Sequence, residues 1–357
     1  MKVELKKRII AFSRLGEYLR LLGNDVSENT TDNDNAEFAK LVKVVEDSYL
    51  HNGWFLEKNV RHMLLSLGKS MDKKSLEEWA SKYQGLTDND KKVKTVAVVM
   101  AGNIPAVGFH DWLSVLMSGN RILAKLSSDD NKLIPTISDL LISIEPEFEN
   151  LISFTDGKLS GFDAVIATGS GNTGRYFDYY FGKYQNIIRR NRNGVAVLSG
   201  NETSEDFEKL ADDVFMYFGL GCRNVSKLFV PKNYDFTPML DVFSKREEIS
   251  NHHKYFNNYE YNKAIYLVNS RPHLDAGNIL LVEDNAFASP VSVLYYEGYS
   301  DLSNLNTRLK MEQASIQCVI SRDPKVNTKL VFGQSQQPQL WDYADGVDTV
   351  EFLIGLD

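Results

Sequence analysis

The stretch "KTVAVVMAGNIPAVGFHDWLSVLMSGNRILAKLSS", residues 94–128, contains two apolar runs typical of buried β-strands, separated by a helical run. The expected strands are "KTVAVVM" and "RILAKLS", and the expected helix is "GFHDWLSVLMSG". Strands that alternate with helices in this way build a parallel sheet with helices packed on it. The stretch therefore predicts an α/β fold.

The same alternation continues on the C-terminal side, through "FDAVIATG", "RYFDYYFGKY" and "GVAVLSG", and a second series runs from "SKLFVP" to "ASIQCVIS". Residues 1 to about 90, at the N-terminal side of these strands, have their apolar residues at helical spacing. The tail "DYADGVDTVEFLIGLD" has the alternation of a short strand. We therefore expect four parts: an N-terminal helical segment (1–90), a first α/β domain (91–218), a second α/β domain (219–335) and a C-terminal β arm (336–357).

Composition narrows the possible partners and compartments. The chain has 357 residues, 43% of them hydrophobic, and a formal net charge of -8, so we expect a large core and no nucleic-acid partner. Its two cysteines form no CxxC pair, which argues against a disulfide framework or a zinc knuckle and favours a reducing compartment. No segment is apolar enough for a signal peptide or a membrane span, so we expect a cytoplasmic protein without membrane insertion.

A glycine-rich turn follows the expected strand "FDAVIATG". In "ATGSGNTGRYF", residues 167–177, the strand passes through Gly169 and Ser170 into a helix that contains Gly174. Unpaired backbone N–H groups at such a turn can bind phosphate, and glycines allow a pyrophosphate to approach closely. A plain strand-to-helix turn is the alternative.

Cys222 stands in "YFGLGCRNVSKLFVP", residues 217–231, after a glycine pair and beside Arg223. If a helix begins there, its N-terminus and the guanidinium would both lower the pKa of the thiol and favour the nucleophilic thiolate. The alternative is a small buried hydrophobic residue, which also fits Cys318 in "SIQCVIS".

Other polar residues have weaker signals. Asn103, in the loop after the first strand, could donate its amide hydrogen to an oxyanion, although alone it would be interpreted as a turn residue. His110 could protonate a leaving group, but a core or surface histidine is the more common case. The adjacent His252 and His253 lack the spacing of metal ligands on one helix face, so we predict no metal site.

Taken together, these elements resemble the aldehyde dehydrogenase superfamily, and most closely its LuxC-like acyl-CoA reductase branch, from about residue 94 to the C-terminus. The resemblance implies an aldehyde-dehydrogenase-like fold in which the first α/β domain binds the cofactor and the second is catalytic. It assigns these site residues: the nucleophile Cys222, the oxyanion-binding Asn103, and the cofactor-binding Lys125, Ser127, Ser128, Gly169, Ser170 and Gly174. By the same resemblance, "FASPVSVLYYE" borders the nicotinamide ribose. A family glutamate near that ribose falls at about Asn285, with Glu283 and Asp284 next to it, so its role is left unassigned.

Two departures from the oxidising members of the superfamily refine this expectation. Val197 of "VAVLSGNET" stands where those enzymes have a general-base glutamate, so water activation is in doubt and exchange with a thiol is favoured. Ser128 stands where the acid that selects NAD is expected. A 2′-phosphate would meet no like charge there, so NADPH is the expected cofactor and NADH remains possible.

We therefore expect an NADPH-dependent reductase that converts the thioester of an acyl-CoA or an acyl-protein to an aldehyde through a covalent intermediate on Cys222, in a homo-oligomer. Two alternatives stay open: an aldehyde dehydrogenase that uses Glu202 as a displaced base, and a subunit that binds an acyl group or a partner without turnover. The aromatic residues in "RYFDYYFGKY" and "HHKYFNNYEYNKAIYLV" are expected in the core or at subunit contacts rather than along an acyl tunnel.

Overall fold

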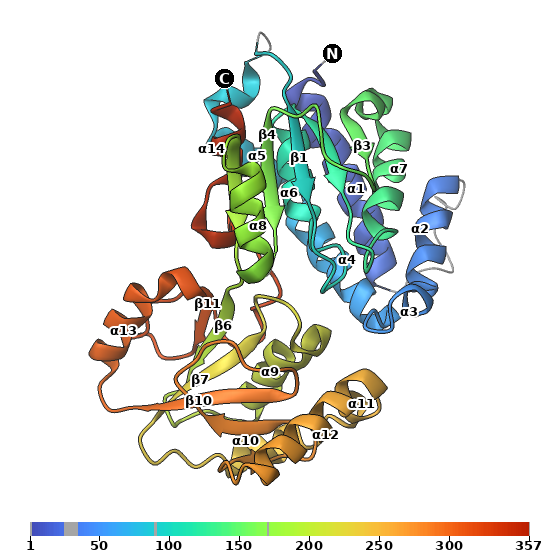
Figure 1. The fold of residues 1–357 in the computed structure, drawn as a ribbon. Helices are drawn as coiled ribbons and strands as arrows, with labels where there is room; N and C mark the ends of the chain where they lie inside the picture. The colour runs from blue at the N-terminus through green and yellow to red at the C-terminus, as the bar shows by residue number, and fades with distance from the viewer. Residues whose placement is uncertain (1, 25–34, 89–90, 170, 357) are drawn as a thin grey trace. The chain divides into compact units, whose positions relative to one another are not determined.

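The computed structural model describes residues 2–24, 35–88, 91–169 and 171–356. These residues divide into two compact units, and each unit has its own parallel sheet. Unit 1 comprises Met1–Arg190 and Pro338–Asp357, and unit 2 comprises Asn191–Gln337. Figure 1 shows the elements of both units.

The sheet of unit 1 has five parallel strands in the order β3-β2-β1-β4-β5. In chain order they are β1 (Thr95–Val99), β2 (Arg121–Lys125), β3 (Ile152–Phe154), β4 (Ala164–Thr168) and β5 (Gln185–Arg189). The chain runs outward in one direction from β1 to β3 and then returns to the other side of β1 with β4. This reversal makes the β1–β4 pair a topological switch point, where open α/β sheets bind their ligands outside the carboxyl ends of the strands.

Helices cover both faces of this sheet. On β1, Val96 and Val98 point into the main core, and Ala97 points into a smaller cluster with Phe177 and Phe181 of α8 (Gly171–Phe181). In Figure 1, α8 accordingly lies on one side of β1 and β4, and α1 (Leu5–Gly23) and α6 (Phe109–Met117) lie on the other. The helices of unit 1 before its C-terminal segment are α1 (Leu5–Gly23), α2 (Ala36–Glu46), α3 (Ser48–His51), α4 (Glu57–Ser70), α5 (Lys73–Ser81), α6 (Phe109–Met117), α7 (Leu133–Ile144) and α8 (Gly171–Phe181), with short 3₁₀ turns η1 (Gln84–Thr87) and η2 (Pro146–Leu151).

The helices expected before residue 90 are present, but they are not a separate part. Phe12 of α1 packs edge-on against Trp112 of α6, with ring centroids 5.6 Å apart, and against Phe148 at 5.5 Å. The N-terminal helices therefore share one core with the first α/β segment.

The prediction of a C-terminal β arm is wrong. Residues 336–357 form the 3₁₀ turn η5 (Ala344–Gly346) and the helix α14 (Thr349–Ile354). Val350 and Leu353 are buried at helical spacing, and the Asp348 side chain caps the helix by accepting the Glu351 N–H at 2.9 Å. A helical apolar period and an N-cap thus outweigh the short alternation in the sequence.

The sheet of unit 2 has the order β11-β6-β7-β10-β9-β8, with only the β8–β9 pair antiparallel. Its strands are β6 (Asn193–Val197), β7 (Val225–Pro231), β8 (Leu274–Asp275), β9 (Leu280–Glu283), β10 (Val293–Tyr299) and β11 (Ile316–Ser321). The first unit was expected to extend to residue 218, whereas the structure divides the chain after Arg190. The reason is that β6 is hydrogen-bonded between β7 and β11 and therefore belongs to unit 2.

The helices of unit 2 lie between its strands along the chain. They are α9 (Ser204–Phe215), α10 (Thr237–Phe243), α11 (Glu247–Ser250), α12 (His253–Val268) and α13 (Leu302–Met311), with the 3₁₀ turns η3 (Met216–Gly219) and η4 (Gln313–Ser315). Across the part of the chain that the structure describes, no helix has the length and apolar character needed to cross a membrane.

Candidate functional site

The carboxyl ends of three neighbouring strands in unit 1 carry predicted site residues. Asn103 is exposed in the loop after β1, Lys125 is the last residue of β2 and pairs with Val99, and Gly169 follows β4. Because β2, β1 and β4 are adjacent and parallel, these residues lie at one edge of the sheet, at its switch point. The topology thus brings together the residues assigned to the oxyanion and to the cofactor in this unit.

The Asn103 loop is held by a buried carboxylate that the sequence analysis missed. Ala106 has a left-handed backbone (φ 51°), and its N–H donates to Asp130 Oδ2 at 2.7 Å. Burial raises the pKa of Asp130 to about 6. The loop also packs tightly elsewhere, since a Cβ atom on Gly102 would lie 2.6 Å from Ser127 Oγ. Asp130 therefore joins the loop after β1 to the loop after β2.

The loop after β2 contains the residues expected to bind the adenosine ribose and its phosphate. Lys125 Nζ donates to the Gly157 carbonyl at 2.9 Å, and Ser127 Oγ accepts the Asp129 N–H at 3.2 Å. Ser128 is exposed. A cavity of about 210 Å³ adjoins this loop and is lined by Val44, Ser48, His51, Phe55, Ser128, Asp129, Asp130, Asn131, Lys132 and Leu133.

The glycine turn after β4 is only partly described, since Ser170 lies outside the described residues. Gly169 donates its N–H to the Arg189 carbonyl at 3.3 Å, and a Cβ atom on Gly169 would lie 2.7 Å from a ring carbon of Phe177. Close packing of the strand on α8 therefore requires a glycine at this position. Gly174 is buried in α8, but a Cβ atom there would be 3.7 Å from its nearest neighbour, so packing alone does not demand glycine.

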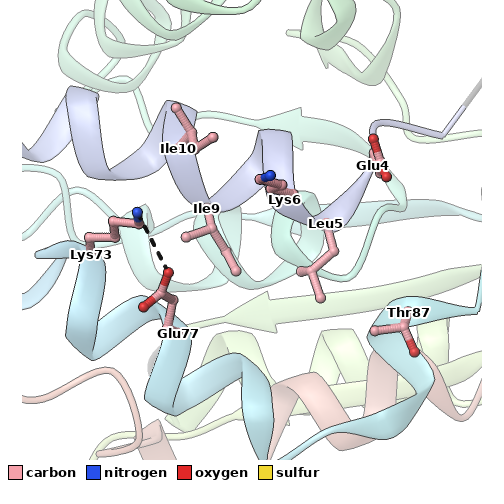
Figure 2. Close-up of a pocket in the computed structure, with 8 residues that line it drawn as sticks. All are labelled: Glu4, Leu5, Lys6, Ile9, Ile10, Lys73, Glu77 and Thr87. Carbon is pink, nitrogen blue, oxygen red and sulfur yellow. Dashed lines mark ion pairs between the residues drawn. The ribbon is translucent and has the colours of Figure 1, made fainter.

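A larger cavity of about 340 Å³ lies elsewhere in unit 1 and contains none of the predicted site residues. Figure 2 shows the side chains that line it, which come from α1, α5 and η1 and their ends: Glu4, Leu5, Lys6, Ile9, Ile10, Lys73, Glu77 and Thr87. Lys73 and Glu77 form an ion pair of 3.9 Å at its side.

Cys222 lies in unit 2, in a turn that leads directly into β7, and it is exposed. The expected helix start at this position is wrong, because Val225 begins a strand. The Asn224 N–H donates to the Gly221 carbonyl at 3.0 Å and closes the turn around Cys222 and Arg223. No helix N-terminus is therefore available to activate this thiol.

The backbone before the turn has an unusual conformation. Tyr217 (φ 51°), Phe218 (φ 58°) and Gly219 (φ 74°) are all left-handed, although the first two carry large buried side chains. Such conformations cost free energy and persist only where the surroundings hold them, often at functional sites. Phe218 is held by stacking on His252, with ring centroids 4.0 Å apart.

Asn224 is the second residue that the sequence analysis missed. It is 2% exposed, and its Oδ1 accepts the Gly221 N–H at 2.8 Å. Its Nδ2 donates to the carbonyls of Asp213 at 3.1 Å and Met216 at 2.8 Å. One side chain thus joins the end of α9 to the turn that carries Cys222.

Asp213, at the end of α9, holds a second segment against this turn. Its carboxylate accepts the N–H groups of Gly333 at 2.6 Å and Ser335 at 2.9 Å, and burial raises its pKa to about 6. The Ser335 carbonyl in turn accepts a hydrogen bond from Arg223 Nε. The Arg223 side chain is therefore engaged with the 333–335 segment.

The position matched to the general-base glutamate lies in the core of unit 2. Val197 is 1% exposed, between Phe229 of β7 and Ser321 of β11. Glu202, the suggested displaced base, accepts hydrogen bonds from the Ser199 N–H at 2.6 Å, the Ser199 hydroxyl at 2.8 Å and the Gly200 N–H at 3.1 Å. Through these hydrogen bonds Glu202 stabilises the turn after β6.

The segment matched to the nicotinamide ribose is fastened to β7. Ser226 Oγ donates to the Phe287 carbonyl at 2.7 Å, and Lys227 Nζ donates to the Asp284 carbonyl. Burial lowers the pKa of Lys227, which also pairs with Glu297 at 3.0 Å. The strand that follows Cys222 therefore also positions this segment and the residues just before it, among which Asn285 is exposed.

The histidines have structural contacts. His110 Nε2 lies 2.8 Å from the Leu340 carbonyl oxygen among Trp79 and Tyr343, which favours its assignment as a core residue, and burial lowers its pKa. His252 Nδ1 accepts the Tyr255 N–H at 3.2 Å at the start of α12. Among the described residues, no three His, Cys, Asp or Glu side chains are grouped as metal ligands.

The two aromatic runs differ in their burial. The aromatic residues of α12 lie largely in the core of unit 2, where Tyr255, Tyr259 and Tyr266 are buried. The aromatic residues of α8 include three with exposed side chains, Tyr176, Tyr179 and Tyr180. Core packing thus explains most of the α12 run, and the α8 run has its tyrosines on the surface of unit 1.

Comparisons with known proteins identify the fold. No protein-family model and no curated protein sequence matches this chain. Solved structures do match. Aldehyde dehydrogenase 21 of Physcomitrella patens, solved with its product succinate, aligns over 96% of this chain and 84% of its own, with a TM-score of 0.66 at 12% identity.

Two further structures show the same likeness. An NAD-dependent benzaldehyde dehydrogenase from Corynebacterium glutamicum covers 92% of this chain and 81% of its own, with a TM-score of 0.62 at 12% identity. An aldehyde dehydrogenase from Bacillus cereus, solved with NAD⁺, covers 90% and 76%, with a TM-score of 0.58 at 11% identity. The chain therefore has the aldehyde dehydrogenase fold, as its sequence predicted.

Proposed function

We propose that this chain is an NADPH-dependent acyl-CoA reductase of the LuxC-like type that forms a fatty aldehyde. The observation that carries the proposal is an exposed Cys222, in a turn ahead of β7, for which neither suggested base is suited to activate water. Val197, matched to the general base by the resemblance, is apolar and buried, and Glu202 accepts three hydrogen bonds from its own turn. A thioester on Cys222 can form by exchange with a second thiol without an activated water. The aldehyde dehydrogenase fold supports an oxidoreductase that acts on aldehydes.

The residues of unit 1 fit a dinucleotide. Lys125, Ser127, Ser128 and Gly169 lie at the carboxyl ends of the strands around a switch point, and a Cβ atom on Gly169 would clash with the Phe177 ring of α8. Neighbours with the same fold are described with NAD⁺ or as NAD-dependent, which supports a nicotinamide cofactor. Lys125 and the serine hydroxyls can bind a 2′-phosphate, so we assign NADPH, with NADH as an alternative cofactor.

In the proposed reaction the Cys222 thiolate attacks the thioester carbonyl and forms a new C–S bond. The Cys222 backbone N–H is assigned to stabilise the oxyanion, and the resemblance assigns the Asn103 amide to the same role. The oxyanion collapses with loss of CoA, or of the carrier protein's thiol, as a thiolate. Bound NADPH supplies the hydride that reduces the carbonyl carbon of the acyl-enzyme. Expulsion of the Cys222 thiolate then releases the aldehyde and regenerates the nucleophile.

A second candidate is an aldehyde dehydrogenase that oxidises an aldehyde to the acid, because the named neighbours are aldehyde dehydrogenases. It requires a base for the attacking water, and Glu202 is the nearest carboxylate in sequence to Val197. The two candidates differ in the fate of the acyl-enzyme, which water must hydrolyse in the dehydrogenase.

The test supplies acyl-CoAs of graded chain length without NADPH and records the intact mass of the protein. The reductase should retain an acyl adduct on Cys222 that disappears when NADPH or CoA is added, and NADPH should yield aldehyde. Cys222→Ala should form neither adduct nor aldehyde, and Cys318→Ala should keep both.

Other outcomes decide against the proposal. Rapid multiple-turnover release of fatty acid from acyl-CoA alone, or formation of acid from aldehyde and NAD(P)⁺ without CoA, supports the dehydrogenase. A wild-type protein that forms no adduct, and whose exposed Cys222 is alkylated by iodoacetamide no faster than a free thiol such as glutathione, supports a binding subunit without turnover.

A further inference from the structure

We propose that Asn224 is a positioning residue that holds the Cys222 thiol in its reactive arrangement, an inference that rests on Cys222 being the proposed nucleophile. Asn224 does not need to touch substrate or cofactor for this role. It acts through the turn from Gly221 to Asn224, whose two central residues are Cys222 and Arg223.

The hydrogen bonds of the Asn224 side chain act on both sides of the turn. Its Oδ1 accepts the Gly221 N–H at 2.8 Å, which fixes the residue before Cys222. Its Nδ2 donates to the Asp213 and Met216 carbonyls, at 3.1 and 2.8 Å, which fixes the turn to the end of α9. The amide is buried with its acceptor and donors all in use, so its orientation is determined.

Three further contacts hold the backbone around Cys222, one each to β6, to β11 and to the 333–335 segment. The Asn224 carbonyl accepts the Gly194 N–H of β6 at 3.1 Å, and the Arg223 carbonyl lies 3.7 Å from Cys318 Sγ of β11. The Arg223 side chain reaches the Ser335 carbonyl. The Cys222 backbone is thus restrained on three sides, while the thiol side chain is exposed.

This restraint replaces what a helix would otherwise supply. Because Cys222 precedes a strand, no helix N-terminus fixes its backbone N–H groups or lowers the pKa of its thiol. The preceding left-handed residues, Tyr217 and Phe218, would relax toward commoner conformations if the turn were released. Asn224 is the side chain that bonds to both the turn and the carbonyl of Met216, directly before these residues.

The experiment compares Asn224→Ser with Asn278→Ser. Both substitutions are neutral in charge and remove a buried amide from the same unit. Asn278 is 1% exposed and its Nδ2 donates to the Phe243 carbonyl at 2.7 Å, so it makes the same kind of contact at the end of another helix, α10. Three quantities are measured: kcat and KM for acyl-CoA reduction, the pH dependence of iodoacetamide alkylation at Cys222, and the melting temperature.

We expect Asn224→Ser to lower kcat at least tenfold, to leave KM for NADPH within twofold, and to move the midpoint of the Cys222 alkylation profile by at least half a pH unit. Asn278→Ser should lower the melting temperature by a similar amount to Asn224→Ser. It should leave kcat within twofold of wild type and the midpoint of the Cys222 alkylation profile within 0.2 pH units. If Asn224→Ser does not fold, Asn224→Gln, which keeps a neutral amide, is measured in its place, with kcat and the alkylation profile as readouts.

The inference is overturned if the Asn224 variant keeps the kcat and the alkylation profile of wild type. It is also overturned if Asn278→Ser lowers kcat and shifts the alkylation profile as much as the Asn224 substitution does. Failure of the proposed function would look different. In that case wild-type Cys222 would be alkylated no faster than a free thiol such as glutathione, and Cys222→Ala would retain whatever activity the protein has.

Discussion

Gly194 donates its backbone N–H to the Asn224 carbonyl oxygen at 3.1 Å, and a Cβ atom on Gly194 would lie 2.6 Å from that same oxygen. The β6 strand can approach the Cys222 turn this closely only because residue 194 has no side chain. The pairing register of β6 and β7 also shifts between Gly194 and Val195, so the two strands are locally irregular here.

Gly194→Ala should therefore destabilise unit 2 and disturb the Cys222 turn. Overpacking against backbone atoms costs about 1–3 kcal/mol. We expect a loss of that size in the free energy of unfolding, measured by urea denaturation, together with a slower alkylation of Cys222. Gly298→Ala in β10 is the matched control, since its Cβ atom would meet only the Lys232 residue, at 3.9 Å. Equal effects of the two substitutions would mean that the close approach is not required.

Lys125→Ala should weaken the binding of NADPH more than the binding of NADH, because only NADPH has a 2′-phosphate that the Lys125 ammonium group can contact. A hydrogen bond to a charged group contributes about 1.5–3 kcal/mol, so the KM for NADPH should rise roughly tenfold or more. Steady-state kinetics with both cofactors measures this difference, and Lys73→Ala removes the same charge from the surface as a control. Equal losses for both cofactors would place Lys125 at the shared ribose.

Val197→Glu should fail to create a general base. The side chain at this position is 1% exposed and packs with Val195 and Phe229, so a glutamate would bury a carboxylate without a partner. We expect a large loss of folded protein, measured by the urea midpoint, whereas Val197→Met, which stays apolar, should lose much less. A folded Val197→Glu variant that releases fatty acid from acyl-CoA would show that this position does reach the thioester.

Asp130→Asn should change how stability depends on pH. Burial raises the pKa of Asp130 from 3.8 to about 6, so between these values the folded protein binds a proton that the unfolded chain has lost. Wild type should therefore gain up to about 3 kcal/mol from this group as the pH falls from 7 to 4, and the variant should not. Urea unfolding at several pH values measures the difference, with Asp129→Asn as the control. If the free energies of unfolding of wild type and variant differed by the same amount at every pH, this role of Asp130 would be excluded.

The sequence predicted many of the strands correctly, but not which of the two units each strand belongs to. The apolar runs that became β1, β4, β6 and β7 were visible because most of their residues are buried, and β2 was visible because its buried Ile122 and Ala124 stand in the apolar run "RILAKLS". The edge strands β3 and β5 were missed, because their exposed residues weaken that signal. The assignment of β6 to unit 2 depends on its pairing with β7 and β11, which is a long-range contact that no local pattern contains.

The candidate site shows the same limit. Cys222, Asn103 and Lys125 could be proposed as site residues because their residue types stand beside strand ends in the order that the resemblance gives. Asn224 and Asp130 were missed because their role lies in hydrogen bonds to backbone groups that are distant in sequence. The helix start expected at Cys222 failed for a related reason, since a glycine pair and a following arginine fit a strand-leading turn equally well.

Arg189 pairs with Asp111 at 2.6 Å and also donates to the Ala344 carbonyl and to Thr349 Oγ1, so the last segment of the chain completes the structure of unit 1. During synthesis on the ribosome this segment emerges only after all of unit 2. Until then the buried pair on β5 and α6 lacks its final partners, while every residue of unit 2 is already available. Unit 2 can therefore fold while the chain is still being made, and completion of unit 1 must wait until its C-terminal segment has emerged.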